Sequence, residues 1–300
     1  MKPGRVRAAP LHHTAVRTER QYPEPAVAAL ACPHCGEPLT VDAEAFRCPQ
    51  HHAFDIARQG YVALLGARSR TDSADSAEMV AYREQFLGAG HYAPIAAAVA
   101  AAGAVSGREP TGPVLEIGAG TGYYLGAVLD AAGPSAAGIA LDASRYAARR
   151  AAADHRTVSV VADAWSPLPV QDGAVAAVLS IFAPRDPAEI SRALGAGGLL
   201  VVVTPRPPHL RELREQLTMV TVDDGKAERL VEKFDGLLRP AGQQDVTFAL
   251  RLQHPDVASL VGMGPSARHV SAAELGSQIT ALPDELTVTA AVTVSSFVKE

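Results

Sequence analysis

Leu115-Glu116-Ile117-Gly118-Ala119-Gly120-Thr121-Gly122 is the stretch of this 300-residue chain that decides its fold. The apolar run Val114–Ile117 predicts a buried strand, and Gly122–Ala132 predicts the helix that follows it. The glycines between them allow a tight turn and let the backbone approach a ligand closely. A strand that turns into a helix through glycines is typical of cofactor-binding α/β folds, although the motif alone does not say which cofactor.

Strands and helices continue to alternate after this turn. Further strands are predicted at residues 137–141, 158–162, 174–182 and 198–204, and helices at residues 142–154 and 187–194. Short apolar runs separated by helices predict a parallel sheet with helices on both faces. Residues 246–252 and 286–298 alternate instead as antiparallel strands do. The predicted fold class is therefore α/β, with a Rossmann-like core.

Acidic residues mark the ends of three successive predicted strands. Glu116 would suit the amino group of a methionyl moiety and repel a pyrophosphate, Asp142 would take a ribose diol, and Asp163 with Ala164 would meet an adenine amino group. This acidic set favours the cationic sulfonium cofactor S-adenosylmethionine. Each acid alone is as readily a helix cap, and an NAD oxidoreductase stays open as the fold-level alternative. The turn contributes the candidate cofactor-binding positions Gly118, Gly120 and Gly122.

All three cysteines of the chain fall in a second constellation, Cys32-Pro-His-Cys35 followed by Cys48-Pro-Gln-His-His52. Two ligands from one tight turn and two from another can close a tetrahedron around Zn²⁺, and thiolates with an imidazole favour zinc. His34, His51 and His52 compete for the fourth place, and His52 is preferred because it gives the wider second turn. Such a fully ligated site is structural, because it leaves no open position for a catalytic water.

Composition bounds the remaining possibilities. A chain of 300 residues with 48% hydrophobic residues can bury one sizeable core and carry a small appendage. No apolar run approaches the roughly 20 residues of a membrane span, and no signal-peptide core follows the N-terminus, so we expect a cytoplasmic protein with no membrane partner. The net charge of −5 argues against a general nucleic-acid coat but not against a local basic face.

Changes of pattern along the chain divide it into four parts. Residues 1–27 are expected to be a flexible tail, residues 28–65 a zinc-binding unit, residues 66–112 a linker and helical segment, and residues 113–300 the main domain. Within the linker segment, residues 76–102 predict a helix interrupted near Gly88.

Motifs along most of the chain resemble those of the bacterial 23S rRNA guanine-N1 methyltransferases of the RlmA/TlrB family. The zinc unit joined to this linker is specific to that family, whereas the glycine turn is not. The matching motifs are the Cys32–Cys35 and Cys48–Asp55 segments, Gly60-Tyr61-Val62, Asp75–Met79, Gly90-His91-Tyr92, Gly122-Tyr123-Tyr124, Phe182-Ala183-Pro184, Thr204-Pro205 and His209-Leu210. The segment Met263–His269 is closer to the macrolide-resistance branch of the family, and the N-terminal extension departs from it.

The resemblance implies a Rossmann-like class I methyltransferase domain with a small N-terminal zinc-binding domain that recognises RNA. The implied reaction moves a methyl group from S-adenosylmethionine to N1 of a guanine in the helix 35 loop of 23S rRNA. A homodimer and, in some members, protection from tylosin-type macrolides are implied as well. Carried over by motif, the zinc ligands are Cys32, Cys35, Cys48 and His52, and the cofactor contacts are Tyr92, Gly122, Tyr123 and His209.

The sequence names no catalytic residue. Guanine N1 carries a proton that must leave during or after the transfer, and Asp186 and His209 are conceivable bases without a motif to support them. Two alternatives from other functional classes stay open at this point. One is a methyltransferase acting on a small molecule or another RNA, and the other is a zinc-containing RNA-binding protein without catalytic activity.

Overall fold

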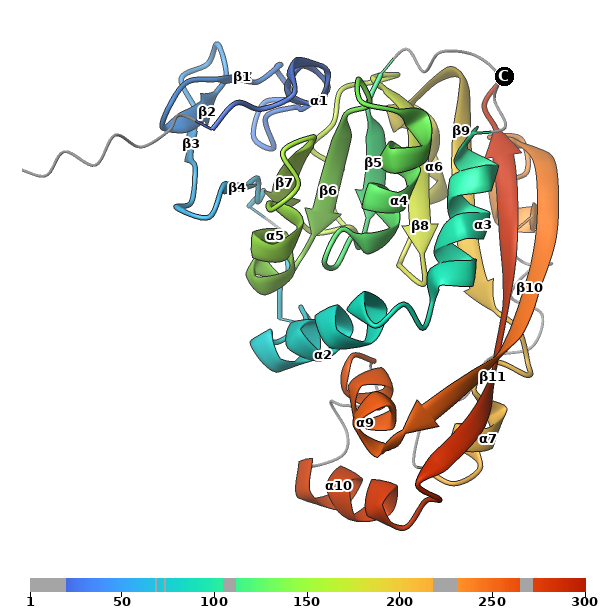
Figure 1. Cartoon of the computed structure of the whole chain (residues 1–300). Helices are drawn as coiled ribbons and strands as arrows, with labels where there is room; N and C mark the ends of the chain where they lie inside the picture. The colour runs from blue at the N-terminus through green and yellow to red at the C-terminus, as the bar shows by residue number, and fades with distance from the viewer. Residues whose placement is uncertain (1–19, 68, 73, 105–111, 218–230, 265–271) are drawn as a thin grey trace, which may run out of the picture.

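The computed structural model of the chain describes residues 20–67, 69–72, 74–104, 112–217, 231–264 and 272–300. Its centre is an eight-stranded mixed sheet packed by helices (Figure 1). In sheet order the strands are β10 (Arg239–Gln253), β11 (Glu285–Val298), β9 (Leu194–Pro205), β8 (Val175–Ile181), β5 (Val114–Ile117), β6 (Gly138–Asp142), β7 (Thr157–Val161) and β4 (Tyr61–Ala63). The predicted α/β, Rossmann-like fold is confirmed.

The topology of the sheet places the ligand site. From β4 through β7, β6, β5 and β8 to β9 all neighbours are parallel, whereas β11 is antiparallel to both β9 and β10. From β5 the chain runs outward to β6 and β7, then returns to add β8 and β9 on the other side. Strand order therefore reverses between β5 and β8, and open α/β sheets bind ligands outside the carboxyl ends of the strands at such a point.

Alternation of apolar residues along β5 shows why the sheet is covered on both faces. Val114 belongs to one apolar layer, and Leu115 and Ile117 belong to the other. Helices α3 (Ala93–Ala104) and α4 (Tyr123–Ala132) cover the Val114 face. Helix α6 (Pro187–Ala193) covers the opposite face, and α5 (Arg145–Ala151) packs beside β6 and β7.

The zinc-binding unit contains a small antiparallel sheet of β1 (Thr40–Val41), β2 (Ala45–Arg47) and β3 (Ala53–Asp55). The next strand, β4, leaves this sheet and pairs in parallel with β7. The last strand of the predicted zinc unit of residues 28–65 is therefore also the edge strand of the main sheet.

The predicted tail of residues 1–27 also needs correction. Helix α1 (Glu24–Ala28) begins after Pro23, and its residue Ala26 is fully buried, as is Leu30 just beyond the helix. Both belong to the apolar layer that includes Leu115 of β5. Residues 20–27 are thus ordered by packing on the main domain, while residues 1–19 lie outside the described part of the chain.

Backbone pairing, a side-chain hydrogen bond and apolar packing attach the zinc unit to the main domain, partly through the connection between β7 and β8. Leu30 forms an antiparallel bridge with Val170. The Gln171 side-chain amide donates to the backbone oxygen of Gly36 at 2.8 Å, inside the first cysteine turn. Phe46 of β2 is fully buried in the same apolar layer. The zinc unit and the main domain therefore share one core rather than being joined by a free linker.

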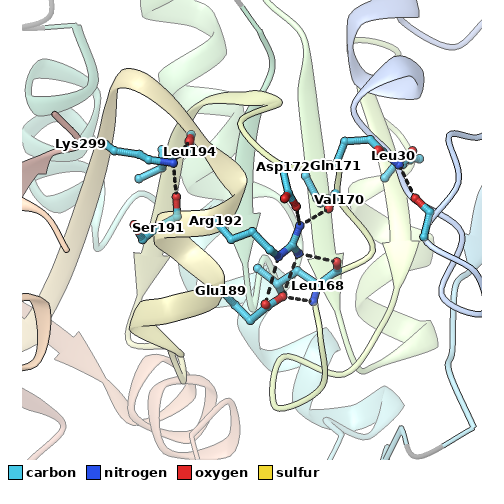
Figure 2. A network of polar contacts seen from close by, with 11 residues as sticks. Leu30, Leu168, Val170, Gln171, Asp172, Glu189, Ser191, Arg192, Leu194 and Lys299 are labelled. Atoms are coloured by element: carbon cyan, nitrogen blue, oxygen red, sulfur yellow. Dashed lines mark hydrogen bonds and ion pairs between the residues drawn. The ribbon is translucent and has the colours of Figure 1, made fainter.

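Arg192 on α6 holds that connection in place (Figure 2). Its guanidinium donates to the carboxylates of Asp172 and Glu189, each at 2.8 Å, and to the backbone oxygens of Leu168 and Val170 at 3.0 and 2.7 Å. The carboxylate of Glu189 in turn accepts from the Leu168 N–H at 2.8 Å. A partly buried arginine with its donors used in this way fixes the segment to which the zinc unit attaches.

Helix α2 (Ala77–Gly88) is capped by Ser76, which accepts a hydrogen bond from the Met79 N–H at 3.2 Å. It ends where the sequence predicted the interruption, and α3 continues at an angle of 83°. Among the described residues no single helix is long and apolar enough to cross a membrane; α2 and α3 would meet the length and composition together, across their bend.

The C-terminal hairpin forms one edge of the main sheet and extends beyond it toward α9 and α10 (Figure 1). Its strands β10 and β11 are longer than the predicted 246–252 and 286–298, and between them lie α9 (His254–Gly262) and α10 (Ala272–Thr280). Helix α9 packs closely on α2, since a Cβ atom on Gly262 would lie 2.3 Å from the ring of Tyr82. The short helix α7 (Arg211–Arg214) lies against β11.

Candidate active site and zinc centre

The four predicted zinc ligands meet in one place. The Sγ atoms of Cys32, Cys35 and Cys48 and one ring nitrogen of His52 lie within 4.8 Å of one another. Cys35 Sγ is 3.6 Å from Cys48 Sγ, and His52 Nδ1 is 3.3 Å from Cys48 Sγ. Ligands at the corners of a tetrahedron around Zn²⁺, with Zn–S bonds of about 2.3 Å, would be about 3.5–3.8 Å apart. Three thiolates and one imidazole in this geometry fit zinc.

Two backbone turns present these ligands. In the first, the Gly36 N–H donates to the oxygen of Cys32 at 2.8 Å, and Gly36 has a φ of 76°. In the second, the His51 N–H donates to the oxygen of Cys48 at 3.0 Å. His51 itself takes a φ of 65° and is exposed, and the ring of His34 stacks on Phe54. Of the competing histidines, the geometry supports His52.

A cavity of about 720 Å³ opens outside the carboxyl ends of the central parallel strands. This volume lies within the range of small-molecule and cofactor sites. The structure does not bring Glu116 or Gly122 to its wall. The predicted cofactor residues that do line it are Tyr92, Gly118, Gly120, Tyr123, Asp142, Asp163, Ala164 and His209.

The glycine turn after β5 is held by its own backbone. Gly118, Gly120 and Gly122 have φ values of 69°, 55° and 79°, which explains the choice of glycine. The N–H groups of Ala119 and Gly122 donate to backbone oxygens, and that of Gly120 donates to Asp142 Oδ2 at 2.8 Å. A pyrophosphate-binding turn directs such groups at its ligand. Here they are already used, which disfavours the dinucleotide alternative.

Asp142 combines a structural and a ligand-facing position. Besides Gly120, it accepts from the Ser144 N–H at 2.8 Å, and it still borders the cavity. Burial raises the pKa of its carboxyl group. Arg83 of α2 lies over the same turn, 2.5 Å from a carboxylate oxygen of Asp75. The loop, the acid and this arginine form one wall of the cavity.

Glu116 makes a contact within the fold that the sequence did not predict. Its side chain is buried, and Oε2 accepts from the Leu125 N–H of α4 at 3.0 Å. Burial raises the pKa of Glu116 to about 8, with the nearby charge of Asp142 adding to the effect, so the carboxyl group is mostly protonated at neutral pH. A neutral acid facing a helix does not fit a direct contact to the cofactor's amino group. The residue instead joins β5 to α4.

Asp163 ties the linker to the end of β7. Its carboxylate accepts from the backbone N–H groups of Arg70 and Trp165, both at 2.9 Å, and from the Ser166 hydroxyl at 3.0 Å. These hydrogen bonds outweigh burial and lower the pKa of Asp163, which keeps it charged. Asp163 and Ala164 both line the cavity, as an adenine-binding position requires.

Tyr92 and His209 form a buried pair on the opposite wall. Nδ1 of His209 accepts from the Ala291 N–H at 3.1 Å, so Nε2 carries the proton and donates toward the Tyr92 hydroxyl at 3.4 Å. Burial, aided by the charge of Arg214, lowers the pKa of His209 to about 4. The ring is therefore neutral, and both of its nitrogens are engaged.

Neither conceivable base is placed for catalysis. The neutral His209 has no free lone pair to take a proton in this arrangement. Asp186 is the N-cap of α6, where its carboxylate accepts from the Ala188 and Glu189 N–H groups, and it does not line the cavity. The catalytic assignment therefore stays empty, as it was from the sequence.

Several lining residues were not identified from the sequence. Phe182 and Arg185 follow β8, so the strand-end argument applied to Asp142 would have found them. Arg83 and Met263 come from α2 and the end of α9, and only the folded chain brings them to the cavity: Arg83 Nη2 donates to the Met263 oxygen at 2.8 Å. Such contacts between distant parts of the chain cannot be predicted from a local sequence motif.

A Rossmann-like sheet, a cavity at its switch point that contains Asp142 and Asp163, and a glycine turn whose Ala119, Gly120 and Gly122 amides are already hydrogen-bonded are the features of a class I S-adenosylmethionine-dependent methyltransferase. The acids suit a cationic sulfonium, and the cavity accommodates a nucleoside. A zinc-binding unit is joined to the main domain through β4, which pairs with β7, and through contacts to the connection between β7 and β8.

Comparison with known proteins gives the family. Residues 30–71 match the family described as RlmA, N-terminal, a zinc ribbon. A Micromonospora griseorubida protein named as a 23S rRNA (guanine-N1)-methyltransferase is 46% identical over 89% of this chain and 96% of its own. The 23S rRNA (guanine(748)-N1)-methyltransferase of Streptomyces fradiae is 44% identical over 88% of this chain and 94% of its own. The chain belongs to the 23S rRNA (guanine-N1)-methyltransferase family.

Among solved structures, one similar chain comes from the complex between the Haloferax volcanii Trm112 methyltransferase activator and a methyltransferase. It aligns at 19% identity over 78% of this chain and 99% of that chain, with a TM-score of 0.49.

We expect the purified protein to contain one zinc ion per chain, which inductively coupled plasma mass spectrometry measures. The double variant Cys35→Ser/Cys48→Ser should lose it, because it removes two of the four ligands. The variant His51→Asn is the matched control: it changes a histidine of the same turn, and asparagine tolerates its positive φ. Zinc loss in the control, or full zinc in the double variant, would contradict the ligand set.

Cofactor affinity should distinguish the two buried acids. Asp142→Asn removes a charge beside the ligand and should weaken S-adenosylmethionine binding roughly ten- to hundredfold, or about 1.5–3 kcal/mol. Glu116→Gln keeps the shape of a carboxyl group that is already neutral, so affinity should change by less than about threefold. Isothermal calorimetry measures both. A larger loss in Glu116→Gln than in Asp142→Asn would restore Glu116 as the direct ligand.

Proposed function

We propose that this protein transfers the methyl group of S-adenosylmethionine to N1 of a guanine in the helix 35 loop of 23S rRNA. The observation that carries the proposal is the arrangement of positive charge around the cofactor cavity. In a chain with a net charge of −5, the cavity is lined by the arginines Arg70, Arg83, Arg185 and Arg214. Guanidinium groups in the lining of a cofactor site suit a polyanionic substrate.

The position of the zinc unit supports an RNA substrate as well. Asp163 lines the cofactor cavity and also a second cavity of about 490 Å³, whose other wall includes Cys32 and His34 of the zinc unit. Trp165, the single tryptophan, lines the cofactor cavity and is 73% exposed. An RNA held by the zinc unit would therefore pass directly to the methyl-transfer site, and an exposed aromatic ring is a natural contact for an unpaired base.

The chemistry demands an unpaired guanine. N1 lies on the Watson–Crick edge, so the base must leave any pairing before it can reach the methyl donor. When bound, S-adenosylmethionine would supply an electrophilic methyl group on its cationic sulfonium sulfur, and S-adenosylhomocysteine would leave as a neutral thioether. The residues of the chain would bind, align and exclude water, and alignment alone contributes a large share of such a transfer.

We base the proposed target position on a named relative, and the proposed phenotype on the family resemblance. The Streptomyces fradiae relative is named for guanine 748, and we propose the same guanine for this chain. Protection from tylosin-type macrolides is part of this proposal, as is the homodimer that the family resemblance implies. Residues 265–269 of the segment that resembles the resistance branch lie outside the described part of the chain.

Primer extension on a 23S rRNA transcript tests the reaction, because a methyl group at N1 blocks pairing and stops the polymerase. We expect a stop at the target guanine after incubation with the protein and S-adenosylmethionine. The stop should fade in Asp142→Asn at limiting cofactor. A transcript with adenine at the target position is the matched control. Methylation of small molecules without any stop on the transcript would favour the small-molecule alternative.

A further inference from the structure

Phe182 is an exposed aromatic side chain at the methyl-transfer end of the sheet. It follows β8 directly, lines the cofactor cavity and is 42% exposed. Its backbone N–H donates to the oxygen of Val203 on β9 at 3.2 Å, so the residue is anchored at the strand end. A large apolar ring left open at a cavity wall costs solvation free energy unless a ligand covers it. A ligand in the cavity could therefore gain binding free energy by covering this ring.

The backbone of Phe182 lies in the left-handed region, with a φ of 53°. For a bulky non-glycine residue this conformation is strained, and such strain is concentrated at functional sites because the surrounding structure must maintain it. The strain is not relieved by burial of the ring. Burial of the side chain would be the usual structural reason for keeping phenylalanine at a strained position, and Phe182 lacks it.

A neutral aromatic stack supports the ring from one side. The planes of Phe182 and His209 are inclined by 22°, with centroids 5.9 Å apart. Tyr92 is hydrogen-bonded to His209, and its ring centroid lies 6.4 Å from that of Phe182. The histidine is held neutral by burial, and its two ring nitrogens are fixed by protein groups. The support is thus rigid and uncharged, as a stacking surface needs to be, while the rest of the Phe182 ring is open to the cavity.

The same segment touches the cofactor turn. A Cβ atom on Gly118 would lie 2.8 Å from the Cβ of Ala183, so the residue after Phe182 is in van der Waals contact with the turn after β5. The Arg185 guanidinium donates to the Ala183 oxygen at 3.2 Å and also lines the cavity. An aromatic face, a cation and the cofactor turn therefore converge at the point where strand order reverses.

We propose that Phe182, backed by His209, is the stacking platform that positions the extruded target guanine for methyl transfer; this rests on the proposed function. Every base has a π-face, so stacking holds the base without consuming its Watson–Crick edge. Arg185, which is bonded to the residue after Phe182 and lines the same cavity, is the candidate contact for an oxygen or phosphate of the same nucleotide. Phe182 thus acts as a positioning residue, and its loss should affect the RNA and not the cofactor.

The test compares methylation of the helix 35 hairpin transcript by the parent and by Phe182→Leu, Phe182→Gly and Phe182→Tyr. Leucine keeps a large side chain at the same strained backbone, as Leu210 does with a φ of 55° in the same chain, and glycine removes the strain altogether. Base–aromatic stacking contributes about 1–3 kcal/mol, so kcat/KM for the RNA should fall roughly 5- to 150-fold in the first two variants. Phe182→Tyr should stay within about threefold because it keeps the ring.

Two further readouts separate positioning from folding. The Kd of S-adenosylhomocysteine should stay within about twofold of the parent value in all variants. A hairpin with fluorescent 2-aminopurine at the target position should emit more strongly in complex with Phe182→Leu than with the parent, since stacking quenches its emission. Tyr146→Leu is the control, because Tyr146 is similarly exposed, at 38%, on α5 and does not line the cavity.

The possible results are distinct. Parental kcat/KM in Phe182→Leu and Phe182→Gly, with unchanged 2-aminopurine emission, would overturn the platform. An equal loss in Phe182→Tyr, accompanied by weaker S-adenosylhomocysteine binding, would also overturn it and give the ring a purely structural role. A parent protein that never methylates the transcript would instead refute the proposed function, on which the platform depends.

Discussion

Pairing of β4 with β7, with the apolar layer behind it, is the constraint on which the rest of the structure depends. Val62 aligns with Val160 in a parallel register, and Phe46, Leu30 and Leu115 share one buried layer. After the small sheet of the zinc unit, the chain thus forms β4, the edge strand of the main sheet, and then continues into α2. Zinc closes a unit too small to bury a core alone, and the main sheet supplies the missing apolar surface.

This construction determines how the cofactor site is assembled. After β4 the linker carries Arg70, whose N–H is held by Asp163 at the end of β7, and then α2 brings Arg83 over the glycine turn. The wall of the cavity therefore combines strand ends of the catalytic sheet with a segment that starts in the zinc unit. Both signs of charge occur in this lining: Asp142 and Asp163 suit a cationic cofactor, while the four arginines suit an anionic substrate.

Features encoded within short segments could be predicted from the sequence. Cys32, Cys35, Cys48 and His52 lie in two turns, so their spacing alone indicated the cluster that the structure contains. The parallel strands could be predicted as well, because each is a short apolar run whose side chains are buried on both faces of the sheet.

The errors have a common origin in long-range contacts. Glu116 ends a strand as Asp142 does, but α4 folds back over it and takes its carboxyl group. Helix α1 looked like a tail because its apolar positions are few, and the sheet it packs against is far away in sequence. Phe182 was noted only as part of a motif, because exposure and a positive φ cannot be seen in a sequence.

The central claim, that the zinc unit and the cofactor domain unfold as one body, can be tested by following two signals through one denaturant titration. Trp165, the only tryptophan, reports on the cavity rim by its fluorescence, and a chromogenic chelator reports the release of zinc. With a shared core, both signals should change at the same denaturant midpoint, and Leu30→Ala should lower that midpoint for both by removing about 2–5 kcal/mol of stability. Release of zinc at a clearly lower denaturant concentration, with Trp165 fluorescence and S-adenosylhomocysteine binding unchanged, would contradict the account.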